Sequence, residues 1–408
     1  MRRSEDAVIP MQKNSEQINI LCGALPDSAC LPSPFQPFST EICTFLNELS
    51  SLLMKHPQSR YYPDIMTFGF FCRKANIEQK RLRYGESLAN RLGRGMTFHI
   101  APSNVPINFA YSMTAALLAG NACIVRASSK PFPQTEIVCG EINKLLDRPE
   151  YSDLKKYITV VRYQHNKEIN DQFSSMCDIR IIWGGDNTIA EVRRSPLLPR
   201  TTEITFADRY SAAVFDASAI LQAKPDLAHE FFNDTYLYDQ NACSSPRLIY
   251  WIGETDKCAD ARKYFWDMIH EHIKDKYHTE PVLTVDKYTT ACRLAIEQDA
   301  VIIPMPDMSV SRIEVRSLSP ELQDHRCAGG SFIEYQAASL EPLAELITQK
   351  VQTISYYGDL SKTLADLVIG HRLTGIDRIV PVGKTADFDL IWDGYDLIIQ
   401  MSRCISIK

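Results

Sequence analysis

The sequence predicts an α/β protein made of two successive units, each a mainly parallel sheet covered by helices. From residue 95 onward, apolar runs typical of buried strands alternate with segments of helical periodicity. The connections are short, and the repeated order strand, helix, strand favours parallel pairing. The same pattern begins again after residue 217, which indicates a second α/β unit.

Each expected element follows from its own pattern. In the first half, apolar runs predict strands at residues 96–101, 122–127, 157–163, 178–185, 201–206 and 211–217. Apolar side chains at helical spacing predict helices at residues 40–54, 105–118, 132–146, 168–175 and 187–194. In the second half, the same criteria predict strands at residues 247–253, 300–306, 331–336, 389–400 and 404–408. They predict helices at residues 226–237, 256–270 and 340–353.

Composition limits the class of protein. A chain of 408 residues has room for roughly two to three domains, and 45% hydrophobic with 23% charged residues is typical of soluble globular proteins. The net charge of 44 − 50 = −6, without a long basic run, argues against nucleic-acid binding. The twelve cysteines include no CxxC pair, and the first ten residues lack the apolar core of a signal peptide. We therefore expect a cytoplasmic protein with reduced cysteines.

Two segments resemble sites of other kinds. Residues 96–125 carry no acidic or basic side chain, as a membrane span would, but their prolines and asparagines favour a buried strand–loop–helix–strand instead. Residues 269–278 contain three histidines in a highly charged sequence. His270 and His272 would point to different sides of a helix, so we expect a solvated helix face and no metal site.

Two candidate ligand-binding segments lie at the carboxyl ends of expected strands, the edge where open α/β sheets bind ligands. Asn104 lies in a proline-flanked loop after residues 96–101. Its amide can donate to an oxygen that becomes negative during a reaction, or it can cap the next helix. Gly184 and Gly185 would let the backbone approach a phosphate at a helix N-terminus. A Gly-Gly pair alone is a weak signal, and the GxGxxG fingerprint is absent from the sequence.

A cluster of donors and charges marks the end of the strand expected at 122–127. Arg126, Ser128, Ser129 and Lys130 follow one another closely there. Cations and hydroxyls in this arrangement suit a phosphate group. An ordinary polar strand end fits the same pattern, and local sequence does not separate the two.

Cys243 is the residue best placed for covalent chemistry. It lies in a small, polar turn between an expected helix and an expected strand, whereas most other cysteines have apolar neighbours that suit core packing. A thiolate exposed in a cleft can act as a nucleophile. A buried turn cysteine is the alternative that the local sequence leaves open.

Taken together, these segments resemble the bacterial acyl-CoA reductase family, a branch of the aldehyde dehydrogenase superfamily. The resemblance runs in order from about residue 60 to 408 and rests on residues 99–134, 183–186, 206–216, 239–251, 352–358 and 375–398. It implies an aldehyde-dehydrogenase-like fold of two Rossmann-type parallel-sheet domains and a small oligomerisation arm. It places an NADP(H)-binding domain at 1–70 and 95–217 and a catalytic domain at 218–375. The arm would comprise a hairpin within 71–94 and the strands of 376–408.

The resemblance also implies roles for the singled-out residues. Cys243 matches the nucleophile, and Asn104 matches the amide that binds the oxyanion together with the Cys243 backbone N–H. Arg126 stands where relatives hold the adenosine ribose. A neutral Ser129, where NAD-preferring relatives often have a glutamate, favours NADPH, with Lys130 close by. The two glycines at 184 and 185 match the region at the pyrophosphate.

Two departures from the superfamily bear on the reaction. Thr205 stands where aldehyde-oxidising members have a glutamate general base, so a thioester intermediate would resist hydrolysis. Glu203, two residues earlier, could substitute for that base. Residues 325–330 occupy the place of the Glu-x-Phe element that holds the nicotinamide ribose.

The sequence therefore predicts an NADPH-dependent reductase that converts an acyl-CoA or acyl-carrier thioester to the aldehyde through acyl-Cys243. The resemblance implies an acyl-protein synthetase or carrier protein as partner, and a homodimer or homotetramer. Two alternatives stay open. One is an aldehyde dehydrogenase working oxidatively, with Glu203 or a water network as base. The other is an acyl-transfer or carrier subunit that is not itself a reductase.

Overall fold

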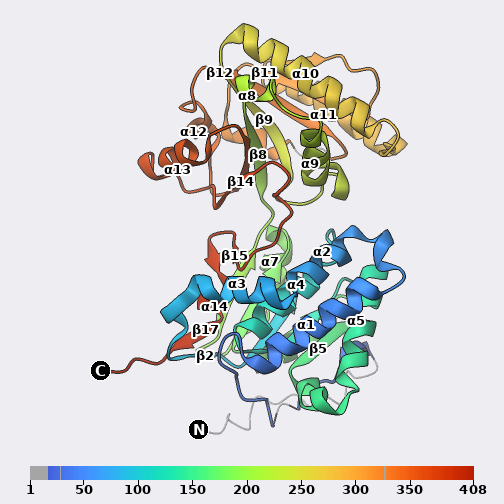
Figure 1. Ribbon diagram of the computed structural model, residues 1–408, viewed down its shortest axis with the longest axis vertical. Coiled ribbons are helices and arrows are strands. Elements are labelled where there is room, and N and C mark those ends of the chain that lie inside the picture. Colours follow the sequence, from blue (N-terminus) through green and yellow to red (C-terminus); the bar gives the residue numbers. More distant parts are fainter. Residues whose placement is uncertain (1–16, 28, 326–327) are drawn as a thin grey trace. The chain divides into compact units, whose positions relative to one another are not determined.

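The computed structural model describes residues 17–27, 29–325 and 328–408, which form two compact units. The first unit comprises the described parts of 1–207 and 390–408, and the second comprises those of 208–389 (Figure 1). The second unit is thus an insertion into the first. The units divide after residue 207 and not after 217, because strand β8 (Tyr210–Asp216) hydrogen-bonds to strands of the second unit. Residues 1–16, where no signal peptide was expected, lie outside the described residues.

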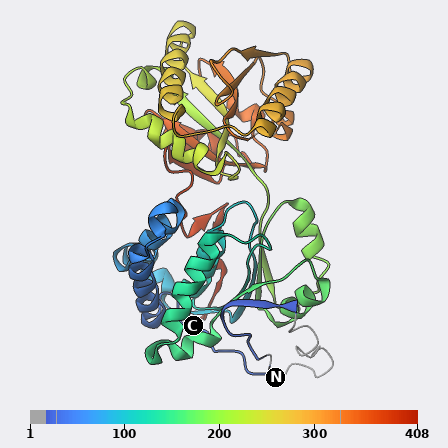
Figure 2. The same ribbon diagram turned by 90° about the vertical axis from the view of Figure 1, so that its right-hand side faces the viewer.

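A six-stranded sheet forms the centre of the first unit (Figure 2). Its order is β1-β5-β4-β3-β6-β7, and every neighbouring pair is parallel except β1 with β5. The strands are β1 (Asn19–Gly23), β3 (Met96–Ile100), β4 (Ala122–Arg126), β5 (Ile158–Arg162), β6 (Ile179–Trp183) and β7 (Thr202–Phe206). Chain order reverses at β3, as in Rossmann sheets, which bind ligands beyond the carboxyl ends of their strands.

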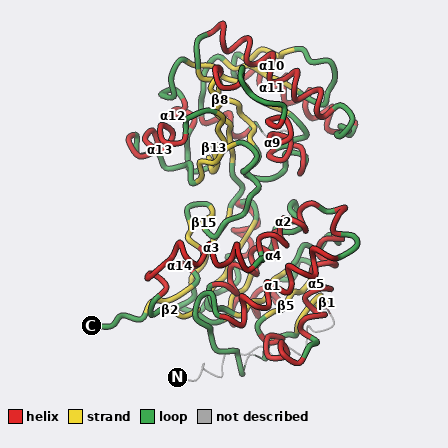
Figure 3. Tube along the Cα trace, in the orientation of Figure 1, coloured by secondary structure: helices red, strands yellow, loops and turns green. Residues whose placement is uncertain are grey.

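Helices cover this sheet (Figure 3), and from β3 to β7 they alternate with strands along the chain as predicted. They are α1 (Thr40–Lys55), α2 (Pro63–Phe71), α3 (Lys74–Tyr84), α4 (Asn108–Leu118), α5 (Pro133–Leu146), α6 (Lys167–Met176), α7 (Asp186–Val192) and α14 (Leu397–Gln400). The uncharged segment 96–125 forms β3, α4 and β4, and nearly every residue of α4 is buried. Within the described ranges, no helix has both the length and the apolar character to cross a membrane.

The segment 71–94 does not contain the expected hairpin. Its longest element is helix α3, whose sequence is rich in the straight-chain residues that favour helices. Only β2 (Arg91–Gly93) is a strand, and it pairs antiparallel with β17 (Ser402–Cys404). Asn121, wholly buried, accepts the backbone N–H of Arg94 at 2.7 Å and donates to the Met401 carbonyl at 2.9 Å. The C-terminal segment is thereby attached to the first unit.

The expected strand at 389–400 is also wrong in most of its length. The chain forms a short hairpin of β15 (Ile391–Trp392) and β16 (Tyr395–Asp396), and then helix α14. Asp393 and Gly394 both have positive φ, as a two-residue hairpin turn requires. The Asp396 side chain then caps α14 by accepting the Ile399 N–H at 3.0 Å.

The second unit is built on a seven-stranded sheet in the order β10-β11-β12-β9-β8-β13-β14. Neighbouring strands are parallel except β10 with β11. The strands besides β8 are β9 (Pro246–Ile252), β10 (Ala300–Ile303), β11 (Ser311–Val315), β12 (Ser331–Ala337), β13 (Val351–Tyr357) and β14 (Arg378–Pro381). Successive residues of β8 enter opposite cores, with Val214 in one and Phe215 in the other. The sheet is therefore covered on both faces.

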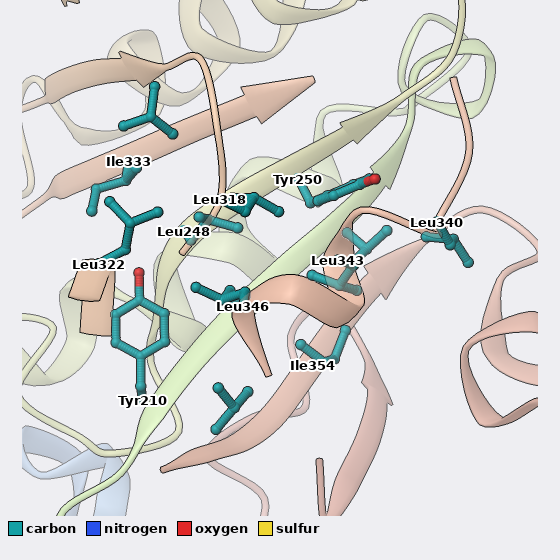
Figure 4. Close-up of a cluster of buried hydrophobic side chains, with 14 of the residues drawn as sticks. Tyr210, Leu248, Tyr250, Leu318, Leu322, Ile333, Leu340, Leu343, Leu346 and Ile354 are labelled. Carbon is teal, nitrogen blue, oxygen red and sulfur yellow. The ribbon is translucent and has the colours of Figure 1, made fainter. Parts of the chain in front are cut away.

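Two sets of helices supply those covers. One core contains residues of α8 (Ala217–Ile220), α9 (Asp226–Asp234) and α10 (Thr255–Ile273). The other, shown in Figure 4, contains residues of α11 (Pro281–Glu297), α12 (Leu343–Leu346) and α13 (Ser361–Gly370). This arrangement confirms the predicted doubly covered sheet.

The helix expected at 340–353 is wrong. Leu340, Leu343 and Leu346 have the spacing of a helix face, and all three are buried in the second of these cores (Figure 4). Only the four residues of α12 are helical. The chain then turns, with the Val351 N–H donating to the Thr348 carbonyl at 3.0 Å, and enters β13.

Candidate active site

Cys243 lies in the turn 239–245, between the 3-10 helix Tyr236–Tyr238 and β9. Its side chain is half-buried, neither exposed nor enclosed in the core. The Cys243 carbonyl accepts a hydrogen bond of 2.7 Å from Ser211 Oγ at the start of β8. Because β8 and β9 are parallel, the turn lies at the amino edge of the second sheet.

Most of the other described cysteines are less suited to nucleophilic attack. Buried members of this set are Cys22, Cys72, Cys123, Cys139, Cys177 and Cys258. Burial raises the pKa of Cys123 to about 12 and that of the half-buried Cys43 to about 11, so both thiols stay protonated at neutral pH. Cys30 and Cys404 are exposed, so exposure alone does not single out Cys243.

Two backbone positions give the cysteine turn its shape. Asp239 and Gln240 have φ of 50° and 59°, a left-handed conformation that is uncommon for non-glycine residues. Gln240 is wholly buried although its side chain is polar. Its burial could not be predicted from the sequence, because a polar residue in a polar turn carries no signal of burial.

Asn104 lies in the exposed loop between β3 and α4. Helix α4 begins at Asn108, and its N-cap residue is Ile107 and not Asn104. The interpretation of Asn104 as a helix cap is therefore wrong. Its loop follows the carboxyl end of β3, at the ligand-binding edge of the first sheet.

The basic cluster lies at the same edge. Arg126 ends β4 and is half-buried, with its guanidinium carbon 4.7 Å from the centroid of the Tyr163 ring. The Lys130 N–H donates to Ser128 Oγ at 3.1 Å, which closes a small turn. Ser129 and Lys130 are exposed. Cationic and hydroxyl groups are thus available at the end of β4.

Arg162 adds a further cation that the sequence analysis missed. It ends β5, the strand beside β4. Its Nε donates to the Ser128 carbonyl at 3.1 Å, and its Nη2 lies 2.9 Å from a Glu136 carboxylate oxygen. The sequence does not identify it, because its position beside the end of β4 depends on β5 becoming the parallel neighbour of that strand.

Gly184 and Gly185 follow β6 and precede α7. A Cβ on Gly184 would come within 2.9 Å of Thr188, so local packing alone requires glycine there. A Cβ on Gly185 would have no described atom within 4 Å. Space at Gly185 is thus open to a ligand. The adjacent Trp183 stacks on Phe206 with ring centroids 3.7 Å apart.

A buried chain of hydrogen bonds begins at the Trp183 indole and holds its ring in place. Its Nε1 donates to Ser112 Oγ at 2.9 Å, Ser112 bonds to His99 Nδ1 at 2.7 Å, and His99 Nε2 bonds to Thr97 Oγ1 at 2.7 Å. Thr97 Oγ1 donates onward to the Ala122 carbonyl at 3.0 Å. Burial lowers the pKa of His99 to about 3, so the imidazole is neutral. Because the Thr97 hydroxyl donates to the Ala122 carbonyl, its oxygen accepts from His99 Nε2.

Glu203 is engaged in ion pairs. Its carboxylate accepts from Arg180 Nε at 2.8 Å and from Arg193 Nε at 2.7 Å, and it also pairs with Arg180 Nη2. Arg180 is almost wholly buried. Both oxygens of Glu203 are thus occupied by guanidinium groups, which disfavours it as a general base. Thr205 lies on the same face of β7 and supplies only a hydroxyl.

The histidines of residues 269–278 have other partners. His270 Nε2 lies 2.8 Å from an Asp307 carboxylate oxygen, and the ring of His272 lies 5.8 Å from that of His229. Among the described residues, no three potential metal ligands come together. Within 325–330, Arg326 and Cys327 lie outside the described residues.

Comparisons of the sequence with known proteins identify one family. Residues 76–295, more than half of the chain, match the model of the acyl-CoA reductase (LuxC) family. Long-chain acyl-protein thioester reductase 2 of Photobacterium leiognathi is 31% identical over 176 residues, which are 42% of this chain and 35% of that protein. The long-chain acyl-protein thioester reductase of Vibrio harveyi is 30% identical over 184 residues, 44% of this chain and 36% of that protein. These matches span about a third of the relatives' length.

Solved structures with a similar fold include two dehydrogenases. An NAD-dependent benzaldehyde dehydrogenase from Corynebacterium glutamicum matches with a TM-score of 0.59 and 13% identity, over 90% of this chain and 84% of that one. The 1-pyrroline-5-carboxylate dehydrogenase of Thermus thermophilus matches with a TM-score of 0.58 and 11% identity, over 90% of this chain and 81% of that one. The predicted aldehyde-dehydrogenase-like α/β fold is confirmed.

Proposed function

Because this chain belongs to the acyl-CoA reductase (LuxC) family, we propose that it reduces an acyl thioester to the aldehyde with NADPH, through an acyl group held on Cys243. The names of its relatives, long-chain acyl-protein thioester reductases, support the reaction class. The observation on which the proposal rests is the half-buried Cys243, in a polar turn within the matched residues.

Cys243 performs the bond-making step. Its thiolate attacks the carbonyl carbon of the thioester, and the tetrahedral oxyanion collapses with loss of the donor thiolate, which leaves the acyl group on Cys243 sulfur. The Cys243 backbone N–H and the Asn104 amide are assigned to the oxyanion by family resemblance. When bound, a reduced nicotinamide supplies the hydride that brings the acyl group to the aldehyde level. Cys243 leaves as thiolate when the aldehyde departs.

The environment of β7 favours reduction over oxidation to an acid. Hydrolysis of acyl-Cys243 needs a base that activates water. Thr205 has no such basicity, and the oxygens of Glu203 are held by Arg180 and Arg193. The acyl-cysteine would therefore persist long enough to be reduced.

The edge of the first sheet fits a phosphorylated dinucleotide. Arg126, Ser128, Ser129 and Lys130 offer two cations and two hydroxyls at the end of β4, and these suit the extra phosphate of NADPH. Gly184 and the open space at Gly185 suit the pyrophosphate after β6. These six residues are proposed to hold the cofactor. Arg162, which donates to the Ser128 carbonyl, would brace this group.

The proposed partners follow from the names of the relatives and from the family resemblance. The acyl donor is an acyl-CoA or an acyl group on a carrier or protein, delivered by an acyl-protein synthetase. We also propose a homodimer or homotetramer. Sedimentation equilibrium tests the subunit number, and a monomer at micromolar concentration would contradict it.

An NADPH absorbance assay over a panel of acyl-CoAs tests the central proposal. Cys243→Ala should abolish turnover while NADPH binding, followed by fluorescence, is retained. Cys292→Ala is the matched control, because Cys292 is also half-buried in the second unit but lies on α11. Undiminished turnover in Cys243→Ala would overturn the proposal.

The two alternatives give different results. Acid formed from aldehyde and NADP without CoA would indicate an oxidative aldehyde dehydrogenase. Stable acylation of Cys243 without NADPH consumption would indicate an acyl-transfer subunit.

A further inference from the structure

The side chain of Gln240 uses its full hydrogen-bonding capacity. Its Nε2 donates to the carbonyls of Pro246 at 2.8 Å and Ser331 at 2.9 Å. Its Oε1 accepts from the N–H groups of Gly330 at 3.1 Å and Ser331 at 3.0 Å. A primary amide has two donors and two acceptor sites, so this buried side chain is fully satisfied.

These bonds close the turn that contains Cys243. Gln240 lies three residues before the cysteine, and Pro246 lies three residues after it. One side chain therefore links both ends of the turn, and it attaches them to the first residues of β12. Two further bonds hold the same turn. Gly329 N–H donates to the Asp239 carbonyl at 2.9 Å, and Ser211 Oγ donates to the Cys243 carbonyl at 2.7 Å.

The partner segment is shaped to receive Gln240. Gly330 has φ of 86°, and a Cβ there would lie 2.3 Å from the Ser309 carbonyl oxygen and 2.6 Å from the Tyr236 hydroxyl. Only glycine fits at this point, and its backbone N–H faces the Gln240 amide at hydrogen-bond distance.

We propose that Gln240 is a positioning residue for Cys243. By fixing both ends of the turn, its amide sets the direction of the cysteine side chain and backbone N–H, and thereby the rate at which Cys243 is acylated. The predicted effect of Gln240 on turnover rests on the proposed function. Its effect on Cys243 itself does not depend on the reaction. Misplacement of a reacting group by about 1 Å costs up to roughly a hundredfold in rate.

The test compares Gln240→Ala with Gln323→Ala. Gln323 is also buried in the second unit, and its amide also links separate segments, donating to the Leu346 carbonyl and accepting from Thr348 Oγ1. Both variants remove a buried, bonded amide, so both should lower the melting temperature. Only Gln240→Ala should lower kcat for an acyl-CoA, by about 30- to 100-fold, with the dissociation constant for NADPH unchanged.

Alkylation of Cys243 by iodoacetamide, mapped by peptide mass spectrometry, gives a readout independent of reductase activity. Its rate should change in Gln240→Ala and stay at the wild-type value in Gln323→Ala. If the wild type reduces no thioester but this difference persists, the proposed function fails and the positioning role stands. Equal alkylation rates and equal kcat in the two variants would overturn the positioning role.

Gln240→Glu supplies a further test that a merely structural role would not pass. As a carboxylate, it still accepts from Gly330 and Ser331 but places negative oxygen against the Pro246 and Ser331 carbonyls. Protonation restores one donor. Turnover of Gln240→Glu relative to wild type should therefore recover as the pH falls, and a constant ratio would contradict the inference.

Discussion

Replacing Glu203 by glutamine decides whether this carboxylate on β7 serves the fold or the chemistry. The side chain accepts two bonds from Arg180, which is 2% exposed, and one from Arg193, which is 56% exposed. Breaking a buried pair costs about 3–5 kcal/mol, whereas an exposed partner contributes about 0–1 kcal/mol. Arg180 Nη1 keeps its bonds to the carbonyls of Val192 and Ser195 at 3.1 and 2.8 Å.

Glutamine retains one acceptor oxygen, so we expect a loss near the lower limit, about 3 kcal/mol. At 2–4 °C per kcal/mol for a unit of this size, the melting temperature of the first unit should fall by roughly 6–12 °C. Calorimetry measures this change. Reductase kcat, measured well below the transition, should stay within about threefold of wild type, because catalysis by a general base is worth at least 100-fold.

Arg193→Gln is the matched control, since it removes only the exposed partner and should cost less than about 1 kcal/mol. The reasoning fails if Glu203→Gln leaves the melting temperature unchanged and lowers kcat by about 100-fold or more. That result would make Glu203 a general base and would favour the oxidative alternative.

Three further predictions concern Asp234, His99 and Arg126. Asp234 accepts backbone N–H groups within 383–385, and burial raises its pKa to about 6, so its contribution to stability falls as the pH rises from about 4 to 6. As the pH rises from 4 to 7, the free energy of unfolding of Asp234→Asn, measured in urea, should increase relative to that of the wild type by up to about 3 kcal/mol. A difference that does not depend on pH would contradict this. His99, with its pKa lowered to about 3, should cost the folded state about 3 kcal/mol between pH 6.5 and 4.5, because only the unfolded chain takes up the proton. His99→Gln should flatten this acid limb of the stability curve. Arg126→Ala should weaken NADPH binding about tenfold and leave NADH binding unchanged; equal effects on both cofactors would discard the phosphate assignment.

Apolar patterns predicted the central strands of both sheets, but β11, β13 and β14 of the second sheet were not predicted as strands. The strands at the centre of each sheet, such as β4 and β9, were identified because buried parallel strands are continuous apolar runs. The same dependence on burial explains why the prediction of a helix at 340–353 was wrong. Its leucines are buried as the spacing implied, but spacing reports burial and not backbone conformation, and β13 takes the last three residues of the segment into the sheet.

The candidate site could be predicted where chemistry is local in sequence. Cys243 in its polar turn and the basic residues after β4 were identified in this way. Gln240 and Arg162 were not, because their partners depend on which strands become neighbours. Glu203 was identified as a candidate base from its position near Thr205. The sequence does not reveal the two arginines whose guanidinium groups bind its carboxylate.

The insertion of the second unit has a consequence for biosynthesis. On the ribosome, the first unit emerges without β17, and the edge of β2 and the Nδ2 donor of Asn121 to Met401 stay unmatched until residues 401–404 are translated. Translation of 208–389 takes roughly 10–40 s at 5–20 residues per second. During that interval the nascent first unit presents an open strand edge, and chaperones that recognise such edges have time to bind it.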